Sequence, residues 1–390
     1  MMQNTGVPIA AELMSEFAEV TGLAAGGEAR KRYLWTDAFA VCNFLGLYRE
    51  TGDAKYRDLA LLLVDRVHEV LGRHRPDDSR RGWISGLEES EGARHPAAGG
   101  LRIGKKLKER GPGEPLDERL EWDRDGQYFH YLTRWIHALD RVSSATGEPV
   151  YRRWAAELAK TAYARFTHVP IPGAPMQMYW KMSIDLSYPL VRSMGHHDPL
   201  DGLSTFAGLR ADMAGGREAE PADLEEEIAG LAAMCEGRDW TTDDPLGIGG
   251  MLCDAHRLAQ IMTPGFFSRP DILADILDAC RYGLLALSGS GSLESPAEYR
   301  LAFRELGLSI GLHALERLYD LVETKPEVFG NQPQLPRQIE ALLRYSFLAD
   351  MIEHFWLEPA NGKVAGFVEH RDINTVMLAA SLVPDGYLAP

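Results

Sequence analysis

Two short turns with the same residue pattern constrain the fold of this chain more than any other feature. The pattern is Thr-Gly-acid followed by Tyr-Arg and then Ala, and it occurs at residues 51–60 and again at residues 146–155. In each copy the glycine suits the left-handed C-cap of one helix, and the acid opens the next helix, where the helix dipole favours negative charge. Because so short a turn makes the two helices antiparallel neighbours, each copy predicts an αα-hairpin.

Apolar residues recur at i, i+3, i+4 and i+7 along nearly the whole chain, whereas runs with period two are scarce. Roughly half of the chain is therefore predicted to be helical, well above the usual one third, and the fold class is all-α. The predicted helices cover residues 8–23, 34–51, 55–73, 126–146, 149–166, 199–214, 221–236, 244–263, 270–287, 299–322, 333–356 and 372–383.

Short and long connections alternate between these helices. The long connections fall at about 24–33, 74–125, 167–198, 237–243, 288–298 and 357–371. Six hairpins follow, each entered from a long connection, and they close naturally into an inner ring of helices within an outer ring. The sequence thus predicts one domain over residues 1–390, with a long functional loop at about 74–125.

With these two turns and with aromatic, acid-rich starts of the inner helices, the sequence resembles the six-hairpin (α/α)6 toroid proteins. Many glycosidases, unsaturated glucuronyl hydrolases and sugar 2-epimerases share that architecture. The resemblance covers the architecture and matches no catalytic signature of a named family. It implies six parallel inner helices whose N-termini meet at one mouth. A solenoid of stacked helix pairs is the alternative, but solenoid repeats are about 34–47 residues long, and the two turns here begin at residues 51 and 146.

The starts of the predicted inner helices combine acids with aromatic and basic residues. Tryptophan lies beside a carboxylate at three of the six starts, which an ordinary solvated rim would not need. Indole faces stack on the C–H face of a pyranose, while guanidinium groups bond its hydroxyls, so we interpret these starts as a sugar-binding lining. The candidate substrate-binding residues are Arg32, Trp35, Trp122, Arg124, Tyr128, Trp240 and Arg371.

Three aspartates at these starts are candidate catalytic carboxylates: Asp37, Asp123 and Asp125. Glycoside hydrolysis needs one carboxyl that protonates the leaving oxygen and one carboxylate that activates water or attacks. Asp123 and Asp125 flank Arg124, so their environments could separate their pKa values. The alternative for each is structural, because aspartate is a preferred N-cap and acids in a first turn stabilise the helix.

Two histidines offer a different chemistry, since imidazole titrates near neutral pH. His197, in the run His196-His197-Asp198, begins the third inner helix, and His370 begins the sixth. A histidine on each side of a sugar C2 is the arrangement of the epimerase relatives, although the rest of their pattern is absent here. Adjacent histidines without a nearby His-x-x-x-His or cysteine partner do not indicate zinc.

Composition excludes several classes of protein. A net charge of −16 without a long basic run argues against nucleic acid as a partner. No window of about 18 apolar residues predicts a membrane span. Four distant cysteines and an N-terminus without a signal-peptide layout favour the cytoplasm. No cofactor is indicated, and the aspartate-rich motifs of terpenoid cyclases are missing.

These observations predict a carbohydrate-active enzyme with a small-molecule or oligosaccharide substrate, most simply a glycosidase-like hydrolase. The alternatives are an epimerase or isomerase that uses the histidine pair, and a non-enzymatic saccharide-binding toroid whose carboxylates only cap helices.

Overall fold

A computed structural model of the chain describes residues 6–23, 31–215, 223–262 and 267–389. The chain divides into two compact units. Unit 1 comprises Met1–Phe17, Gly46–Asp53 and Cys235–Pro390, and unit 2 comprises Ala18–Leu45 and Ala54–Met234. Both units are built mainly of helices, which confirms the all-α class. The prediction of one domain over residues 1–390 stays a prediction.

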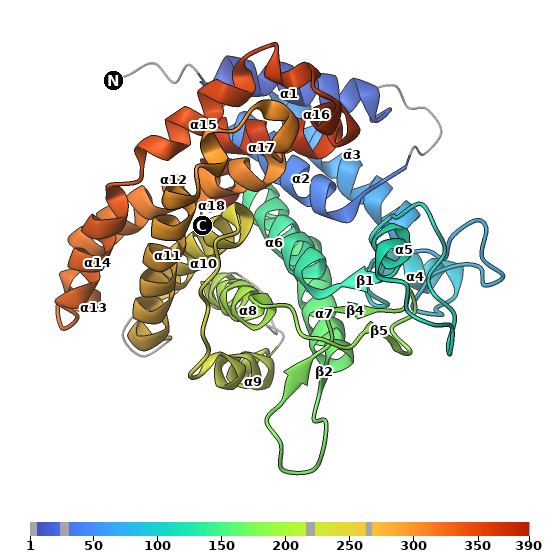
Figure 1. The fold of residues 1–390 in the computed structure, drawn as a ribbon. Helices are drawn as coiled ribbons and strands as arrows, with labels where there is room; N and C mark the ends of the chain where they lie inside the picture. The colour runs from blue at the N-terminus through green and yellow to red at the C-terminus, as the bar shows by residue number, and fades with distance from the viewer. Residues whose placement is uncertain (1–5, 24–30, 216–222, 263–266, 390) are drawn as a thin grey trace. The chain divides into compact units, whose positions relative to one another are not determined.

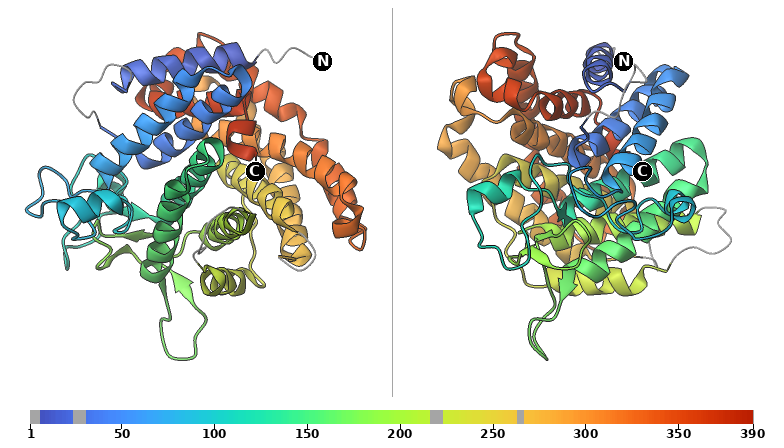
Figure 2. Two further views of the ribbon diagram at one scale, coloured as in Figure 1. Left: turned by 180° about the vertical axis from the view of Figure 1, so that it is seen from behind. Right: turned by 90° about the vertical axis from the view of Figure 1, so that its right-hand side faces the viewer.

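Unit 2 combines long helices with short strands (Figure 1). It includes the first part of α2 (Leu34–Thr51) and a three-stranded antiparallel sheet in the order β1-β4-β5. The β2–β3 hairpin projects from the helices of this unit (Figure 2). Its other helices are α3 (Ala54–Leu71), α4 (Glu89–Arg94), α5 (Glu118–Asp123), α6 (Phe129–Thr146), α7 (Pro149–Phe166), α8 (Asp198–Gly215) and α9 (Glu225–Cys235). The strands are β1 (Gln127–Tyr128), β2 (Thr167–His168), β3 (Gln177–Met178), β4 (Lys181–Met182) and β5 (Pro189–Val191).

Unit 1 contains most of α1 (Gly6–Val20) and the C-terminal helices of the chain. The predicted helix at 333–356 is two helices in the structure, because consecutive i→i+3 hydrogen bonds replace the α-helical ladder around residues 342–348. The helices are α10 (Pro245–Ile261), α11 (Pro270–Ser290), α12 (Ala302–Thr324), α13 (Pro326–Phe329), α14 (Gln334–Leu343), α15 (Phe347–Leu357), α16 (Ala365–Glu369), α17 (Arg371–Leu382) and α18 (Asp385–Leu388).

The two Thr-Gly-acid turns have the same geometry, as the repeat predicts. Gly52 and Gly147 are left-handed, with φ of 69° and 77°, and each amide donates to the carbonyl four residues earlier at 2.8 Å. In both copies the threonine hydroxyl also accepts from the amide two residues later at 3.2 Å. The pattern therefore ends one helix and starts the next twice in the same way.

Within unit 1, α10 and α12 approach each other closely through glycines (Figure 1). A Cβ at Gly249 would lie 2.1 Å from the carbonyl oxygen of Gly307, and one at Gly311 would lie 2.5 Å from Cα of Gly249. These positions tolerate no side chain, so glycine sets the separation of the two helices. None of the helices in the described ranges is long and apolar enough for a membrane span.

In each unit, the predicted inner helices begin beside one another. In unit 2, Tyr33 before α2 meets Tyr131 of α6 through their hydroxyls at 2.7 Å. In unit 1, Arg304 of α12 pairs with Asp244 before α10 at 2.6 Å, and the start of α12 also contacts α17. The predicted convergence of inner-helix N-termini is thus confirmed separately for α2, α6 and α8 and for α10, α12 and α17.

Candidate functional site

The N-terminal ends of the inner helices in unit 2 bring together the aromatic cluster, which consists of Trp35, Tyr128, His130, Tyr131 and Trp180. The imidazole of His130 stacks at 24° on Tyr128 and at 18° on Trp180, with centroid separations of 5.3 and 6.5 Å, and the rings of Tyr128 and Trp180 are 5.1 Å from each other. Trp35 and Tyr131 meet the imidazole edge-on at 6.1 and 5.0 Å. The cluster therefore holds one titratable ring in a fixed orientation among aromatic surfaces.

Strand pairing explains how Trp180 reaches this cluster from the connection after α7. Tyr128 of β1 lies opposite Lys181 of β4, so the residue before β4 is placed next to β1. The Lys181 ammonium is fully buried and donates at 2.8 Å to a carboxylate oxygen and the carbonyl oxygen of Glu121 and to the carbonyl oxygen of Arg124. These bonds fix β4 to α5 and thereby hold Trp180 in place.

Asp198, the first residue of α8, lies beside the histidine. Its Oδ1 is 3.3 Å from Nδ1 of His130, within ion-pair distance although the angle is poor for a hydrogen bond. Oδ2 of Asp198 is buried and has no hydrogen-bond partner among the described residues. Nε1 of Trp35 is also buried and likewise has no partner in those ranges. Nε2 of His130 makes no hydrogen bond within the same ranges, and the side chain is 24% exposed. Unsatisfied buried polar atoms are rare in folded proteins and often mark functional positions.

The neighbouring acid, Asp201, has a different environment. Its carboxylate accepts from the Arg134 guanidinium and from the Thr133 hydroxyl, and all three side chains are buried. The same guanidinium lies 5.4 Å from the ring centre of Trp35. Asp201 is therefore paired and anchors α8 to α6, while one carboxylate oxygen of Asp198 is buried without a hydrogen-bond partner among the described residues.

The phenol of Tyr33 lies beside the aromatic cluster. The hydroxyls of Tyr33 and Tyr131 are hydrogen bonded to each other, and burial raises the pKa of Tyr33 to about 12. Burial also raises the pKa of Tyr128. The Tyr33 and Tyr128 hydroxyls are therefore protonated at neutral pH, and Tyr33 supplies a neutral hydrogen-bond donor within its pair with Tyr131.

Asp125, one of the predicted catalytic carboxylates, is fully buried and saturated with donors. Its Oδ2 accepts from Arg102 at 3.0 Å and from Arg75 at 3.2 Å. Its Oδ1 accepts from the backbone amides of Gly104 and Gly126 at 2.9 and 3.1 Å. Four donors surround the carboxylate, and none of its oxygens is available to a substrate. We therefore leave Asp125 out of the proposed site and assign it to the anchoring of the long loop at 74–125.

The other two predicted carboxylates lie in different settings. Asp37 is buried, and its carboxylate accepts from the backbone amide of Tyr33 at 3.2 Å, as an acid in a first turn does. The Arg32 guanidinium lies 3.5 Å from the Asp37 carboxylate and also donates to the carbonyl oxygen of Thr21. Both side chains thus organise the start of α2. Asp123 is exposed at the end of α5. Neither aspartate carries the proposal below.

The predicted tryptophans separate into different environments. Trp35 belongs to the aromatic cluster, as does Tyr128. Trp122 is 55% exposed and meets Trp180 edge-on at 5.4 Å. Trp240 is 1% exposed within unit 1, where Arg238 lies over its ring. A ring buried in this way is not available to a sugar in this structure, so Trp240 is left out of the proposed site.

The two remaining predicted arginines both form ion pairs. Arg124 pairs with Glu114 at 2.5 Å and donates to a carbonyl oxygen of the loop before α5. Arg371, at the start of α17, is exposed and pairs with Glu16 of α1. Each guanidinium therefore has a structural partner already, and neither is placed in the proposed site.

The predicted histidine pair lies in two different units. His197 precedes α8, where its carbonyl oxygen accepts from the amide of Asp201 and its ring meets His196 at 4.5 Å. His370 is exposed at the N-cap of α17 and meets Phe303 edge-on at 5.8 Å. Their action as a pair stays a prediction.

Sequence reasoning did not select His130, Tyr131, Trp180 or Asp198 as site residues. A signal existed for His130 and Tyr131, which lie in the first turn of a predicted inner helix directly after Tyr128. Trp180 had no local signal, because only the pairing of β1 with β4 brings it to the cluster.

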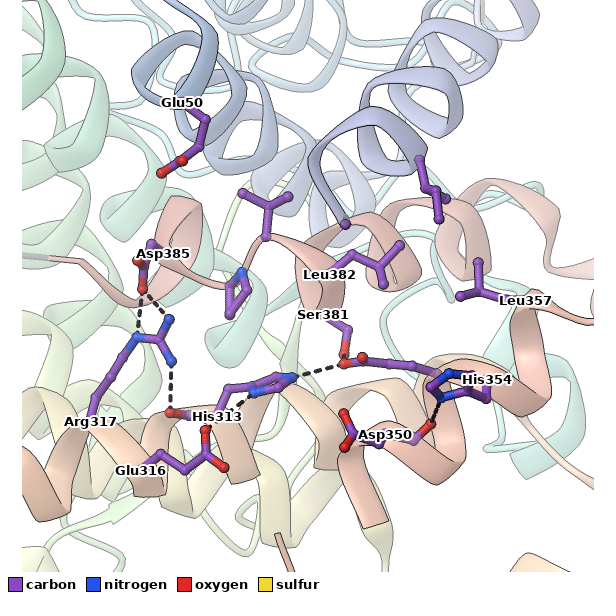
Figure 3. A pocket seen from close by; sticks show the side chains of 15 residues that line it. Glu50, His313, Glu316, Arg317, Asp350, His354, Leu357, Ser381, Leu382 and Asp385 are labelled. Atoms are coloured by element: carbon purple, nitrogen blue, oxygen red, sulfur yellow. Dashed lines mark hydrogen bonds and ion pairs between the residues drawn. The ribbon is translucent and has the colours of Figure 1, made fainter. Parts of the chain in front are cut away.

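Unit 1 contains a polar cavity of about 480 Å³ near the C-terminal end of α17 (Figure 3). Oε1 of Glu353 accepts there from Ser309, from Ser381 and from Nε2 of His313 at 2.8, 2.5 and 2.8 Å. Burial alone lowers the pKa of His313, but hydrogen bonds to Glu316 and Glu353 outweigh it and raise the pKa to about 9. This network ties α12 to α15 and α17, and its members are occupied with one another.

No family model matches the sequence, and a comparison with curated proteins finds no match. Among solved structures, the GH76 alpha-mannanase from Bacteroides thetaiotaomicron is 8% identical, with 96% of each chain covered and a TM-score of 0.54. A D-mannose isomerase is 12% identical, with 98% of each chain covered and a TM-score of 0.52. At these identities the likeness shows the fold: the chain has the (α/α)6 toroid fold, which confirms the prediction.

Proposed function

We propose that this protein is a carbohydrate-active enzyme that transfers protons on a hexose at His130, as an aldose–ketose isomerase does. One observation carries the proposal: an imidazole packed against two aromatic rings, with a buried carboxylate 3.3 Å from its Nδ1 and with no hydrogen bond from its Nε2 to any described residue. The fold is that of proteins named for a mannan and for mannose, which supports a sugar as the substrate.

Asp198 defines the role of each imidazole nitrogen. A carboxylate beside Nδ1 favours the tautomer with its proton on Nδ1, which leaves Nε2 as the base. Nε2 then takes the proton from C2 of the open-chain aldose, and the electron pair forms the C1=C2 bond of an enediol. The carbonyl oxygen O1 receives a proton from the Tyr33–Tyr131 hydroxyl pair. The hydroxyl on C2 then gives its proton from O2 to that pair, so both tyrosines are again neutral. Return of the proton from Nε2 to C1 completes the ketose.

The aromatic rings orient the imidazole for this step. Trp35 meets it edge-on, and the indole N–H of Trp35 is buried without an acceptor among the described residues. Tyr128 and Trp180 both stack on the imidazole and limit its rotation. Pre-organised groups of this kind reduce the entropy that the reaction must lose.

Glycosidic cleavage by paired carboxylates is the second candidate, and the unoccupied Oδ2 of Asp198 favours it. Hydrolysis needs a second carboxyl group across the scissile bond. Among the predicted acids, Asp125 is saturated and Asp37 is engaged by the start of α2. Because the site offers a histidine–carboxylate pair more directly than two free carboxyls, we place isomerisation first.

The test measures turnover of free hexoses and hexosides by the purified protein. We expect conversion of D-mannose, D-glucose or D-fructose to another hexose, with solvent deuterium entering the product in D₂O, visible by NMR. His130→Asn should lower the rate by about 10²–10⁴-fold, the usual contribution of a general base. The control His196→Asn changes an exposed histidine two residues before α8 and should keep the rate.

Each outcome has a defined meaning. Release of sugar from an aryl mannoside without hexose interconversion would favour the hydrolase. A His130→Asn protein that is folded and fully active would overturn the assignment of His130. Failure to turn over any hexose or hexoside would overturn the proposed enzymatic function.

A further inference from the structure

A cavity of about 760 Å³ lies in unit 2 on the aromatic cluster. Tyr128 and Trp180 line it and also contact His130, so the same two rings belong to the cluster and to the cavity wall. The rest of the lining comes from the loop around residues 110–116, from α5 and from β5 with the residues that follow it. This cavity takes no part in the proton transfer proposed above.

Trp122 is the most unusual residue in this lining. Its side chain is one of the largest in the protein, yet the residue is 55% exposed. It is nevertheless held in place, because its ring packs edge-on against Trp180 at 77° and 5.4 Å. An indole face that is both exposed and oriented is suited to stacking on the C–H face of a sugar ring, whereas buried tryptophans serve packing.

Ion pairs and hydrogen bonds keep the cavity open and rigid. The Arg110 guanidinium donates to Glu121 of α5 at 3.1 Å, to the carbonyl oxygen of Glu114 at 2.8 Å and to that of Leu190 in β5. Tyr188 donates its hydroxyl to the carbonyl oxygen of Arg110 at 2.7 Å. The three walls are thus tied together by the protein's own side chains, as in a largely pre-formed binding site.

Two charged side chains of the lining have no partner. The Arg192 guanidinium and the Glu118 carboxylate make no hydrogen bond or ion pair with any residue in the described ranges. Most other charged groups of this wall are paired, as Arg110 is with Glu121. Arg192 and Glu118 are therefore available to bond the hydroxyls, or in the case of Arg192 a carboxylate, of a bound molecule.

We propose that this cavity binds a second pyranose ring, stacked on Trp122 and hydrogen bonded by Arg192, so that the substrate is a disaccharide or longer. The inference rests on the proposed function for the placement of the first ring at His130. Trp180 stacks on His130 at 6.5 Å and meets Trp122 at 5.4 Å, so this one ring lies beside both sites.

The test is saccharide binding by the full-length His130→Asn protein, measured by isothermal titration calorimetry, because binding then needs no turnover. The probes are mannose, mannobiose, mannotriose and a uronate-containing disaccharide. We expect disaccharides to bind at least about tenfold more tightly than mannose, and Trp122→Ala to remove that gain, as truncation of an aromatic anchor does. Arg192→Gln should weaken the uronate disaccharide more than mannobiose if the second ring is acidic, and both equally if it is neutral.

Two further variants control for folding and shape. Leu120→Ala removes an exposed side chain of the same short helix that does not line the cavity, and it should leave affinity unchanged. Trp122→Phe keeps an aromatic face and should retain part of the gain.

The results separate this inference from the proposed function. If the wild-type protein interconverts hexoses but disaccharides bind no better than mannose, the second-ring site is overturned and the proposed function stands. If disaccharides bind through Trp122 but no hexose or hexoside is turned over, the second-ring site stands and the proposed function falls. Affinity unchanged by Trp122→Ala overturns the inference whatever the turnover.

Discussion

Replacement of Asp125 provides the sharpest test of whether a carboxylate at an inner-helix start is catalytic or structural. The side chain is fully buried, and its oxygens accept from two guanidinium groups and two backbone amides. Asp125→Ala would leave the Arg102 guanidinium, which is 8% exposed, without its counter-charge. We expect the main effect of the substitution to be a loss of folding free energy rather than a specific loss of chemistry.

The magnitude follows from these contacts. Breaking a buried ion pair by removing one partner costs about 3–5 kcal/mol. Arg102 keeps the carbonyl oxygens of Arg73 and Val70 as acceptors, which favours the lower part of that range. The amides of Gly104 and Gly126 lose their acceptor as well, so we expect a total near 4 kcal/mol. That is a large fraction of the 5–15 kcal/mol by which a typical protein is stable.

Urea denaturation followed by circular dichroism would measure this loss. Asp125→Asn keeps one oxygen for the two amides but removes the charge, so its stability should lie between those of the wild type and Asp125→Ala. Asp123→Asn is the matched control, because this exposed residue lies two positions away and should change stability by no more than about 0.5 kcal/mol. An Asp125→Ala protein as stable as the wild type but inactive would refute the reasoning and restore Asp125 as a catalytic residue.

Three further predictions concern packing and pH. Gly249→Ala places a Cβ 2.1 Å from the carbonyl oxygen of Gly307, so we expect it to lower the free energy of unfolding by about 1–3 kcal/mol or more. Urea denaturation measures this loss. Gly289→Ala is the control, because its Cβ meets open space and should not destabilise the protein. Burial lowers the pKa of His68 to about 3, so at mildly acidic pH the unfolded chain binds a proton on this histidine and the native state does not. The protein therefore loses stability as pH falls below about 6.5. His68→Phe should reduce this dependence of stability on pH, measured by thermal unfolding across pH 3–6.5. The pKa of His313 in the folded protein is raised to about 9. Its contribution to folding stability is therefore fully present below about pH 6.5 and is lost as pH rises through 9. His313→Gln should flatten the alkaline side of the stability profile, and an unchanged profile would contradict the assigned pKa.

Local patterns were sufficient for the helices and for their pairing. The Thr-Gly-acid turns predicted two αα-hairpins, and the structure has the same left-handed glycine and the same hydrogen bonds in both. Such turns depend only on neighbouring residues, so the sequence carries their full signal. The break between α14 and α15 was missed, since apolar periodicity continues across it while the hydrogen bonds change locally to i→i+3.

Local sequence patterns therefore predicted the all-α class and the alternation of short and long connections, because periodicity and turn chemistry are local properties, whereas the meeting of inner-helix starts was implied by the resemblance to toroid proteins. The sequence also drew attention to Trp35 and Tyr128, which do lie in the aromatic cluster. Which of these polar groups lack hydrogen-bond partners depends on the tertiary structure. Asp125 and Asp198 look alike as acids at helix starts, but four donors surround the first, while one oxygen of the second is buried without a partner in the described chain. That difference arises from residues distant in sequence, and only folding brings them together.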